Sequence, residues 1–326
     1  MLFDSKLKEV LAGISSPGIA MAICDRNRVL WQHTGGFSDS DGKIPIDFDT
    51  PFSVGSVTRA FTGHAILILR DEGLLALDEP LEHSVPESSS LRYPTLDSPR
   101  ITLRNLLTHT SGLPRVMVHL DKSLGHDPDE REFLECLQKL TLDHAPGADA
   151  THSALGFVLL GLVIHRKSGK PYDVFVKERI LEPLSMSTAT FSSGVTIADD
   201  GLCLSARELA RFVNFQLNAW PPRDDSDPGP LKRASVRESH CIGGLQLLGP
   251  RPKGLGWELL SDRPLETVVW HNARSQNGHQ VAVAFDPKVG IGIIALGSGH
   301  FHSDRPLRAL LSAYAIDHAL VKDERR

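Results

Sequence analysis

A serine at the start of an apolar helix is the first candidate for chemistry in this chain of 326 residues. Ser56 closes an extended run that begins at Pro51, and apolar residues at helical spacing follow it as far as Gly73, a plausible C-cap. A serine at a helix start can cap the helix by accepting a hydrogen bond from a free N–H of the first turn. It can also be a nucleophile, because those N–H groups and the helix dipole favour a developing negative charge. The stretch alone leaves both interpretations open.

The hydrophobic pattern of the chain predicts the elements that would position this serine. Two apolar runs on either side of the polar residues 25–28 predict a β-hairpin over 17–35. Amphipathic helices are predicted near the two ends, at 1–11 and 306–321. Strand-like runs return in the last third of the chain. They lie at 257–260, 267–271, 281–285 and 290–296.

The middle of the chain is predicted to be helical, with one helix, at 157–164, that is apolar on all sides and therefore buried. Residues 74–99 and 221–230 are rich in turn-forming residues and predict a connector and a surface loop. Strands at both ends imply one sheet domain of residues 1–80 and 240–326, with a mainly helical lobe of residues 81–239 inserted in it. The other helices of the lobe are expected at 102–109, 131–140, 172–180 and 205–217.

Composition and charge exclude several classes of protein. The chain is 41% hydrophobic and 23% charged, which is ordinary for a globular protein. A net charge of −5 without a basic stripe argues against nucleic acid as a partner. No run approaches ~20 apolar residues, so a membrane partner is not expected either. The four cysteines are widely spaced and the first residues lack the pattern of a secretion signal, so we expect reduced thiols in a cytoplasmic protein.

Four segments, at 52–62, 101–114, 202–212 and 254–257, carry a family resemblance that runs in order over nearly the whole chain. They resemble the serine β-lactamase and penicillin-binding protein superfamily, closest to the branch of class C β-lactamases and family VIII esterases and transesterases. The resemblance implies an α/β (α+β) fold with an antiparallel sheet, flanking terminal helices and a pocket beside the helical lobe. It also implies that Ser56 attacks an acyl carbonyl while a lysine and a tyrosine move protons.

The sequence departs from the family pattern at positions that carry proton transfer. Arg59 replaces the lysine one helical turn after Ser56, and a guanidinium, with a pKa above about 12, cannot act as a base. The second motif falls at 152–154, with His152 in place of tyrosine and Ala154 in place of asparagine. Imidazole is a usual partner of a nucleophilic serine, so a Ser56–His152 dyad is one hypothesis. The other is that His152 only fills the pocket wall.

The third motif falls at 271–273, on the predicted strand beside the pocket. Alanine stands there in place of glycine, and its methyl group would disturb an oxyanion pocket that the family forms from N–H groups of the nucleophile and the strand. The resemblance therefore implies two sets of site residues. The catalytic candidates are Ser56, Arg59, His152 and His271, and the substrate-binding candidates are Ala154, Trp270, Asn272, Ala273 and Arg274.

Other polar residues have simpler interpretations. A buried arginine normally has a carboxylate partner, so Arg59 could be structural. His109 is expected to be a hydrogen-bonded core residue, and Tyr172 a packing residue, not the missing catalytic tyrosine. His300 and His302 form a short His-x-His element without an evident third ligand, so no metal site is predicted. No cofactor is expected.

Three functions stay open for a small carbonyl-containing substrate. The first is hydrolysis or acyl transfer on an ester, thioester or lactone, through Ser56 and His152. The second is cyclisation, isomerisation or elimination in secondary metabolism, without an acyl-enzyme, in a repurposed pocket. The third is ligand binding by a pseudoenzyme. Hydrolysis of β-lactams is not expected, because the lysine and the asparagine that serve it are absent.

Overall fold

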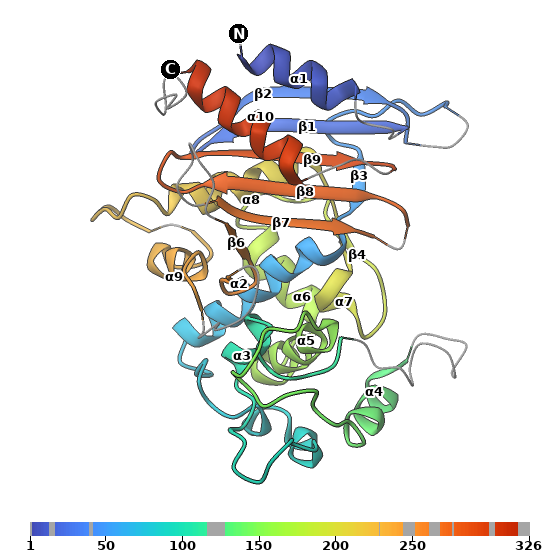
Figure 1. The fold of residues 1–326 in the computed structure, drawn as a ribbon, viewed down its shortest axis with the longest axis vertical. Helices are drawn as coiled ribbons and strands as arrows, with labels where there is room; N and C mark the ends of the chain where they lie inside the picture. The colour runs from blue at the N-terminus through green and yellow to red at the C-terminus, as the bar shows by residue number, and fades with distance from the viewer. Residues whose placement is uncertain are drawn as a thin grey trace.

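The structure is a computed structural model that describes residues 2–12, 17–38, 42–115, 128–227, 229–243, 252–260, 268–275, 277–299 and 304–318. An antiparallel six-stranded sheet is its central element, as Figure 1 shows. The strands are β1 (Gly18–Asp25), β2 (Val29–Gly36), β6 (Glu258–Leu260), β7 (Val268–Arg274), β8 (Gln280–Asp286) and β9 (Ile291–Gly297). Their order is β2-β1-β9-β8-β7-β6, so β1 pairs directly with β9. This confirms the α/β class and the antiparallel sheet built from distant parts of the chain.

Helices cover both faces of the sheet and form the lobe below it in Figure 1. The α-helices are α1 (Leu2–Ala12), α2 (Thr58–Asp71), α3 (Leu103–Leu107), α4 (Glu130–Leu137), α5 (Ala154–Ser168), α6 (Tyr172–Val176), α7 (Ile197–Asp200), α8 (Ala206–Asn218), α9 (Arg233–Ser239) and α10 (Asp304–Asp317). Short 3₁₀ turns lie at η1 (Gly55–Val57), η2 (Leu81–His83) and η3 (Pro86–Ser90). Among the described residues, none of these helices is long and apolar enough to cross a bilayer.

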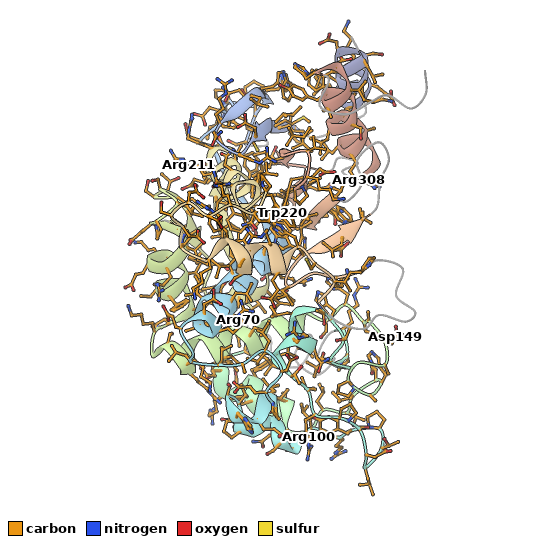
Figure 2. The ribbon with its side chains drawn as sticks, turned by 90° about the vertical axis from the view of Figure 1, so that its left-hand side faces the viewer. Arg70, Arg100, Asp149, Arg211, Trp220 and Arg308 are labelled. Carbon is orange, nitrogen blue, oxygen red and sulfur yellow. The ribbon has the colours of Figure 1, made fainter. Side chains whose placement is uncertain are left out.

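The sheet separates two apolar cores because successive side chains of a strand point to opposite faces. On β1, the odd-numbered residues from Ile19 to Ile23 pack with α1 and α10, and the even-numbered residues from Ala20 to Cys24 pack with the rest of the molecule. Figure 2 shows Arg211 of α8 and Arg308 of α10 on opposite sides of the sheet. The terminal helices therefore lie on one face, and the helical lobe joins the other.

A second, three-stranded sheet connects the lobe to the region around Ser56. Its order is β3-β5-β4, formed by β3 (Pro51–Ser53), β5 (Leu202–Ser205) and β4 (Thr190–Phe191). Strand β3 leads into η1, and β5 leads into α8 through a capping box between Ser205 and Glu208. Because β3 and β5 are antiparallel, their pairing links the segment before α2 to the segment before α8, and the two helices leave from opposite ends of the strand pair.

Two helix boundaries differ from the expectation. The helix expected from Ser56 onward begins as η1, and α2 starts only at Thr58. The helix expected over 172–180 ends at Val176 and continues as a π-helical turn, η4 (Lys177–Leu181). The buried helix was predicted well, because α5 is buried from Leu155 to Ile164. The division into a sheet domain and a lobe remains a prediction, and α8, inside the expected lobe, packs against β1 and β9.

Candidate active site

The turn that carries Ser56 is held against strand β7. Gly55 has a φ of +51°, and a Cβ placed on it would lie 3.1 Å from the methyl group of Ala273. The hydroxyl of Thr58 donates to the Gly55 carbonyl at 2.6 Å, and the N–H of Val54 donates to Leu202 of β5 at 2.9 Å. A side chain at residue 55 would push the turn away from β7. The extra methyl group of Ala273 is therefore accommodated by the missing side chain of Gly55.

Ser56 does not cap the helix, so the capping hypothesis is wrong. Neither η1 nor α2 has a side-chain capping hydrogen bond, and α2 follows Val57, whose backbone is already helical. Within the described part of the chain, the Ser56 hydroxyl makes no hydrogen bond, and the side chain is partly exposed. The backbone N–H of Ser56 lies in the first turn of η1, where N–H groups have no partner inside the helix. The residue therefore presents a hydroxyl and an N–H at the same place.

Arg59 is buried and bonded on two sides. Its Nε donates to Asp199 Oδ1 of α7 at 2.7 Å, and both side chains are at most 8% exposed. Its Nη1 contacts Nε2 of His152, and its guanidinium lies over the ring of Phe157 at 5.3 Å. Burial raises the pKa of Asp199, and the Arg59 guanidinium opposes that rise. The carboxylate partner expected for a buried arginine is present, and it fixes Arg59 in the wall of the site.

The contact with Arg59 determines the state of His152. A guanidinium can only donate, so Nε2 of His152 must accept and the ring proton lies on Nδ1. Burial is the main cause that lowers the pKa of His152 to about 3, and the positive charges of Arg59 and Lys253 contribute to the shift. His152 is therefore a neutral ring whose available polar atom is a donor. The expected Ser56–His152 hydrogen bond is absent from the described residues, because Arg59 occupies the lone pair that would accept it.

His271 has the complementary tautomer. Its Nδ1 lies 3.1 Å from the carbonyl oxygen of Asn272, which can only accept, so Nδ1 is protonated and Nε2 carries the lone pair. Burial is the main cause that lowers the pKa of His271 to about 4, and Arg59 adds to the effect. His271 is thus neutral near pH 7 with an unprotonated Nε2.

Strand β7 divides the other predicted residues between its two faces. His271 and Ala273 share the face directed at η1 and the lobe, where Ala273 belongs to the core with α2. Trp270, which the sequence analysis placed among the substrate-binding residues, belongs to the opposite core with α10. The physical reason is the two-residue alternation of a strand, which also directs Asn272 and Arg274 to that opposite face. A role for those two in substrate binding would have to use their backbone.

The backbone of Arg274 is placed for such a role. The N–H of Ser275 donates to His279 at 2.8 Å, so the N–H of Arg274 points to the other edge of β7. Strand β6 pairs with that edge only up to Trp270, opposite Glu258. The Arg274 N–H therefore faces the open end of the strand, beside the Gly55 turn that packs against β7.

An ion pair that the sequence analysis missed completes the site. Lys253 Nζ lies 2.6 Å from Oε1 of Glu258, and both side chains are mostly buried. The charge of Lys253 lowers the pKa values of His109, His152 and His271, which places it near all three. One signal in the sequence could have identified Lys253, since it directly precedes the 254–257 segment of the resemblance. Asp199 had no such signal, because nothing in its surroundings marks it as the partner of Arg59.

Ala154 and His109 lie next to His152. Ala154 begins α5, and its N–H donates to the carbonyl of Arg115 at 3.4 Å. His109 is buried and hydrogen-bonded to Ser153, as expected for a core residue, and its ring stacks on that of His152. Tyr172 is buried and bonded to Thr62 at 2.8 Å, in agreement with a packing role.

The described residues contain no group of three His, Cys, Asp or Glu side chains suited to a metal ion. His300 and His302 lie outside the described residues. The four cysteines, which are all described, are unpaired.

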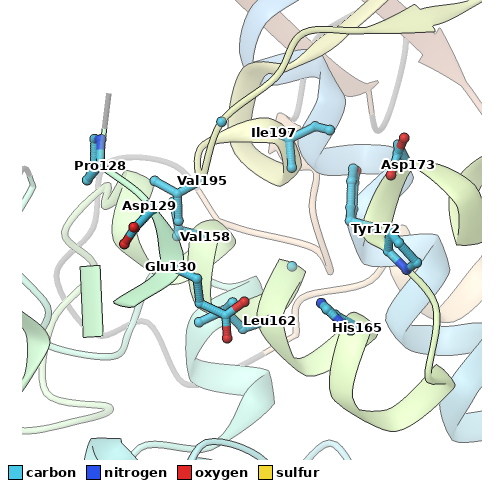
Figure 3. Close-up of a pocket in the computed structure, with 13 residues that line it drawn as sticks. Pro128, Asp129, Glu130, Val158, Leu162, His165, Tyr172, Asp173, Val195 and Ile197 are labelled. Atoms are coloured by element: carbon cyan, nitrogen blue, oxygen red, sulfur yellow. The ribbon is translucent and has the colours of Figure 1, made fainter. Parts of the chain in front are cut away.

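A separate cavity of about 350 Å³ lies in the helical lobe (Figure 3). Its lining includes Leu162 and His165 of α5, Tyr172 of α6, Ile197 of α7 and Glu130 of α4. None of the predicted site residues lines it. It shares α7 with the Arg59–Asp199 pair, because Ile197 lies two residues before Asp199.

A serine on a helix-start turn, an antiparallel sheet beside it and a helical lobe that supplies the opposite wall are the arrangement of the β-lactamase and penicillin-binding protein superfamily, whose members are generally serine hydrolases. The Beta-lactamase family model matches residues 3–315, so the chain belongs to this family. Two solved structures have the same fold. They are the octameric penicillin-binding protein homologue from Pyrococcus abyssi (TM-score 0.77, 22% identity, 97% of this chain and 77% of that one) and a beta-lactamase/D-alanine carboxypeptidase from Pseudomonas syringae (TM-score 0.76, 19% identity, 98% of both chains).

The chain also resembles curated proteins, but it covers only part of their length. Protein flp of Staphylococcus aureus (strain MW2) is 25% identical over 86% of this chain and 59% of its own length. The D-alanyl-D-alanine-carboxypeptidase/endopeptidase AmpH of Escherichia coli (strain K12) is 30% identical over 59% of this chain and 49% of its own length. The chain thus aligns with about half to three fifths of these relatives.

Proposed function

We propose that the chain is a serine hydrolase or acyltransferase in which Ser56 is the nucleophile and His271 is the general base. The observation that carries this proposal is the Ser56 hydroxyl, partly exposed and without a hydrogen bond in the described part of the chain, on a turn packed against the strand that presents His271. His271 offers the unprotonated Nε2 that Arg59 denies to His152. The proposal keeps the nucleophile of the sequence analysis and changes its base.

The reaction divides between these groups as follows. Ser56 Oγ bonds to the acyl carbon while its proton passes to His271 Nε2, and the leaving group departs with that proton. Water then attacks the acyl carbon and gives a proton to His271. The bond from the acyl carbon to Ser56 Oγ breaks, Ser56 takes the proton back from His271, and the acid product leaves. The N–H groups of Ser56 and Arg274 stabilise the carbonyl oxygen as it becomes negative. His152 donates from Nδ1 to a substrate oxygen, and the fixed charge of Arg59 strengthens that donor.

We also propose a small, mostly apolar ester, thioester or lactone as the substrate. In the described part of the site, each cation is matched by its own carboxylate, Arg59 by Asp199 and Lys253 by Glu258. The imidazoles of His109, His152 and His271 have lowered pKa values and are neutral. A substrate without charge suits such a site, because a buried charge without a partner is costly.

Intact-mass spectrometry after treatment with a fluorophosphonate tests the nucleophile. We expect one adduct in the wild type and in Ser89→Ala, which removes an exposed serine, and none in Ser56→Ala. The wild type and Ser89→Ala should turn over p-nitrophenyl butyrate, and Ser56→Ala should not. Turnover of p-nitrophenyl butyrate should exceed turnover of p-nitrophenyl succinate, which bears a carboxylate. Absence of both adduct and turnover in the wild type would contradict the acyl-enzyme mechanism.

A non-hydrolytic reaction is the second candidate, and the Arg59–His152 contact favours it. The pair places a fixed positive charge behind a neutral N–H donor, an arrangement that can polarise a carbonyl for cyclisation, isomerisation or elimination. In that case Ser56→Ala keeps the full rate on the substrate, whereas Arg59→Ala and His152→Ala abolish it. Binding of a metabolite without turnover by any of these proteins would instead indicate a pseudoenzyme.

A further inference from the structure

His109 has a backbone conformation that is uncommon for residues other than glycine. Its φ is +58°, in the left-handed region that mostly glycine and asparagine adopt. Three residues later the chain uses a glycine, Gly112, for a φ of +77°. A strained non-glycine residue that persists beside a candidate site is a reason to ask what its side chain does there.

The side chain and backbone of His109 hold the segment 151–153 at three points. Its carbonyl accepts from the N–H of Thr151 at 3.0 Å, and its Nδ1 accepts from the N–H of Ser153 at 3.2 Å. Between these two bonds, its ring stacks on the ring of His152, with centroids 4.5 Å apart and planes 26° apart. Each residue of the segment is therefore bound to His109.

The ring of His109 is neutral, with its proton on Nε2. Nδ1 accepts from a backbone N–H, so the ring proton lies on Nε2. Burial lowers the pKa of His109 well below its ordinary value, and the charge of Arg59 adds to the effect. A protonated His109 would face Arg59 across His152, so the neutral ring is the one compatible with the geometry. Phe157 supports the ring from another side at 5.2 Å.

We propose that His109 is the positioning residue that fixes the imidazole of His152 in the candidate active site. His109 holds one face of that ring and both neighbouring peptide groups, and Arg59 holds its Nε2. The direction of the His152 Nδ1–H donor is then fixed by two contacts from different elements. His109 follows the end of α3, and Arg59 lies at the start of α2. His109 acts through His152 and makes no contact with the reacting atoms in this arrangement.

Histidine side-chain NMR tests the positioning without any assumption about the reaction. In the wild type we expect a single neutral His152 tautomer, protonated on Nδ1, that does not titrate between pH 5 and 8. His109→Asn tolerates the left-handed backbone and keeps an acceptor for Ser153 but removes the stacked ring. In this variant, His152 should exchange between tautomers, and its pKa should shift upward as water reaches the ring. The charged and titratable groups that remain around His152 are Arg59, Lys253, Glu258 and His271.

Two further variants keep the test decisive. His109→Gly relieves the backbone strain and removes all side-chain contacts of residue 109. It should fold even if strain prevents His109→Asn from folding. Its effect on the tautomer exchange of His152 should be at least as large as that of His109→Asn. His64→Asn is the matched control, because it removes a buried histidine of α2 that is bonded to Ala60 of the same helix and to Gln216 of α8. It should lower the melting temperature but leave the His152 signals unchanged. Unchanged His152 signals in both His109 variants would overturn the proposal.

The kinetic test rests on the proposed function. With p-nitrophenyl butyrate, His109→Asn should lower kcat about 10- to 100-fold while KM changes less than about threefold, because a misdirected donor affects the transition state most. Labelling of Ser56 by the fluorophosphonate should persist. Wild-type protein without labelling would refute the acyl-enzyme but leave the NMR result valid. A labelled wild type with full kcat and an ordered His152 in His109→Asn would refute only the positioning role.

Discussion

At the scale of single residues, the site depends on which nitrogen of each histidine carries the proton. Arg59 fixes one tautomer in His152, and a backbone carbonyl fixes the other in His271. The sequence could place these histidines through the family resemblance, since both stand at motif positions. It could not assign their roles, because the tautomers depend on contacts with residues that lie far away in the chain. The predicted base was therefore His152, whereas the geometry favours His271.

The assignment of His271 predicts the acid side of the pH–rate profile. The pKa of His271 is about 4 in the free protein, so the base is unprotonated above that pH and becomes protonated below it. We expect kcat/KM for p-nitrophenyl butyrate to stay level from pH 7 to about 5 and to fall as the pH drops through about 4. His271→Gln should lose about 10²- to 10⁴-fold in kcat/KM, the usual contribution of a general base. A fall centred near pH 6.5 would contradict the assignment.

Two ion pairs of different burial allow a direct test of what holds Arg59. Asp199→Asn leaves the buried guanidinium without its carboxylate and should lower the free energy of unfolding by about 3–5 kcal/mol. Asp49→Asn breaks the exposed pair with Arg207 and should cost no more than about 1 kcal/mol. Urea denaturation at pH 7 measures both. Equal losses in the two variants would show that Arg59 does not depend on Asp199.

At the scale of elements, the site is built by packing the η1 turn against β7. Sequence patterns predicted both elements, because an apolar helix and an alternating strand have distinct periods. They placed the helix start two residues early, since η1 and α2 share one apolar pattern. The sequence could not show that Trp270 lies on the other face of β7 from Ala273, because a strand buried on both faces has no polar alternation that would identify its pocket side.

Glycine substitutions test the contact between the turn and the strand. Gly55→Ala must hold a φ of +51° and places a Cβ 3.1 Å from Ala273, so it should destabilise the protein and reduce fluorophosphonate labelling of Ser56. Gly73→Ala has a φ of +76° with no atom within 4 Å of the added Cβ. It should cost only the left-handed backbone, about 1–2 kcal/mol, with labelling unchanged. Equal labelling in the two variants would argue that the turn tolerates displacement.

At the scale of the whole molecule, a buried chain of hydrogen bonds links α2, α8 and the region of α9. Trp220 donates to His240 Nδ1 at 3.1 Å, and His240 Nε2 donates to Oε1 of Gln216 at 3.0 Å. The amide nitrogen of Gln216 donates in turn to Nε2 of His64 at 3.0 Å. His64 Nδ1 then bonds the carbonyl of Ala60 at 2.7 Å. No sequence pattern marked this network, because its members are scattered over 180 residues and each is unremarkable alone. In this arrangement each ring accepts one hydrogen bond, His64 from Gln216 and His240 from Trp220, so both histidines are neutral.

The network predicts loss of stability in acid. Burial lowers the pKa of His64 to about 4 and that of His240 well below its ordinary value. In the unfolded chain these two histidines bind protons near pH 6.5, whereas in the folded chain they do not. The free energy of unfolding should therefore fall as the pH drops from 6.5 toward 4. His240→Gln removes one of these groups and should give a shallower slope between pH 7.5 and 5 in urea denaturation. An identical slope would exclude His240 as a source of the acid sensitivity.

The contact between the first and the last helix also has a consequence for how the chain could be rearranged. The N–H groups of Leu2 and Phe3 donate to the carboxylate of Asp317, at 3.1 and 2.8 Å. Joining these ends by a short linker and opening the chain at the exposed Gly169 would give a circular permutant that keeps every strand pairing. In such a permutant the two halves of the sheet would become one continuous stretch of sequence. The strands would then be synthesised in the order in which they lie side by side in the sheet, from β6 to β2.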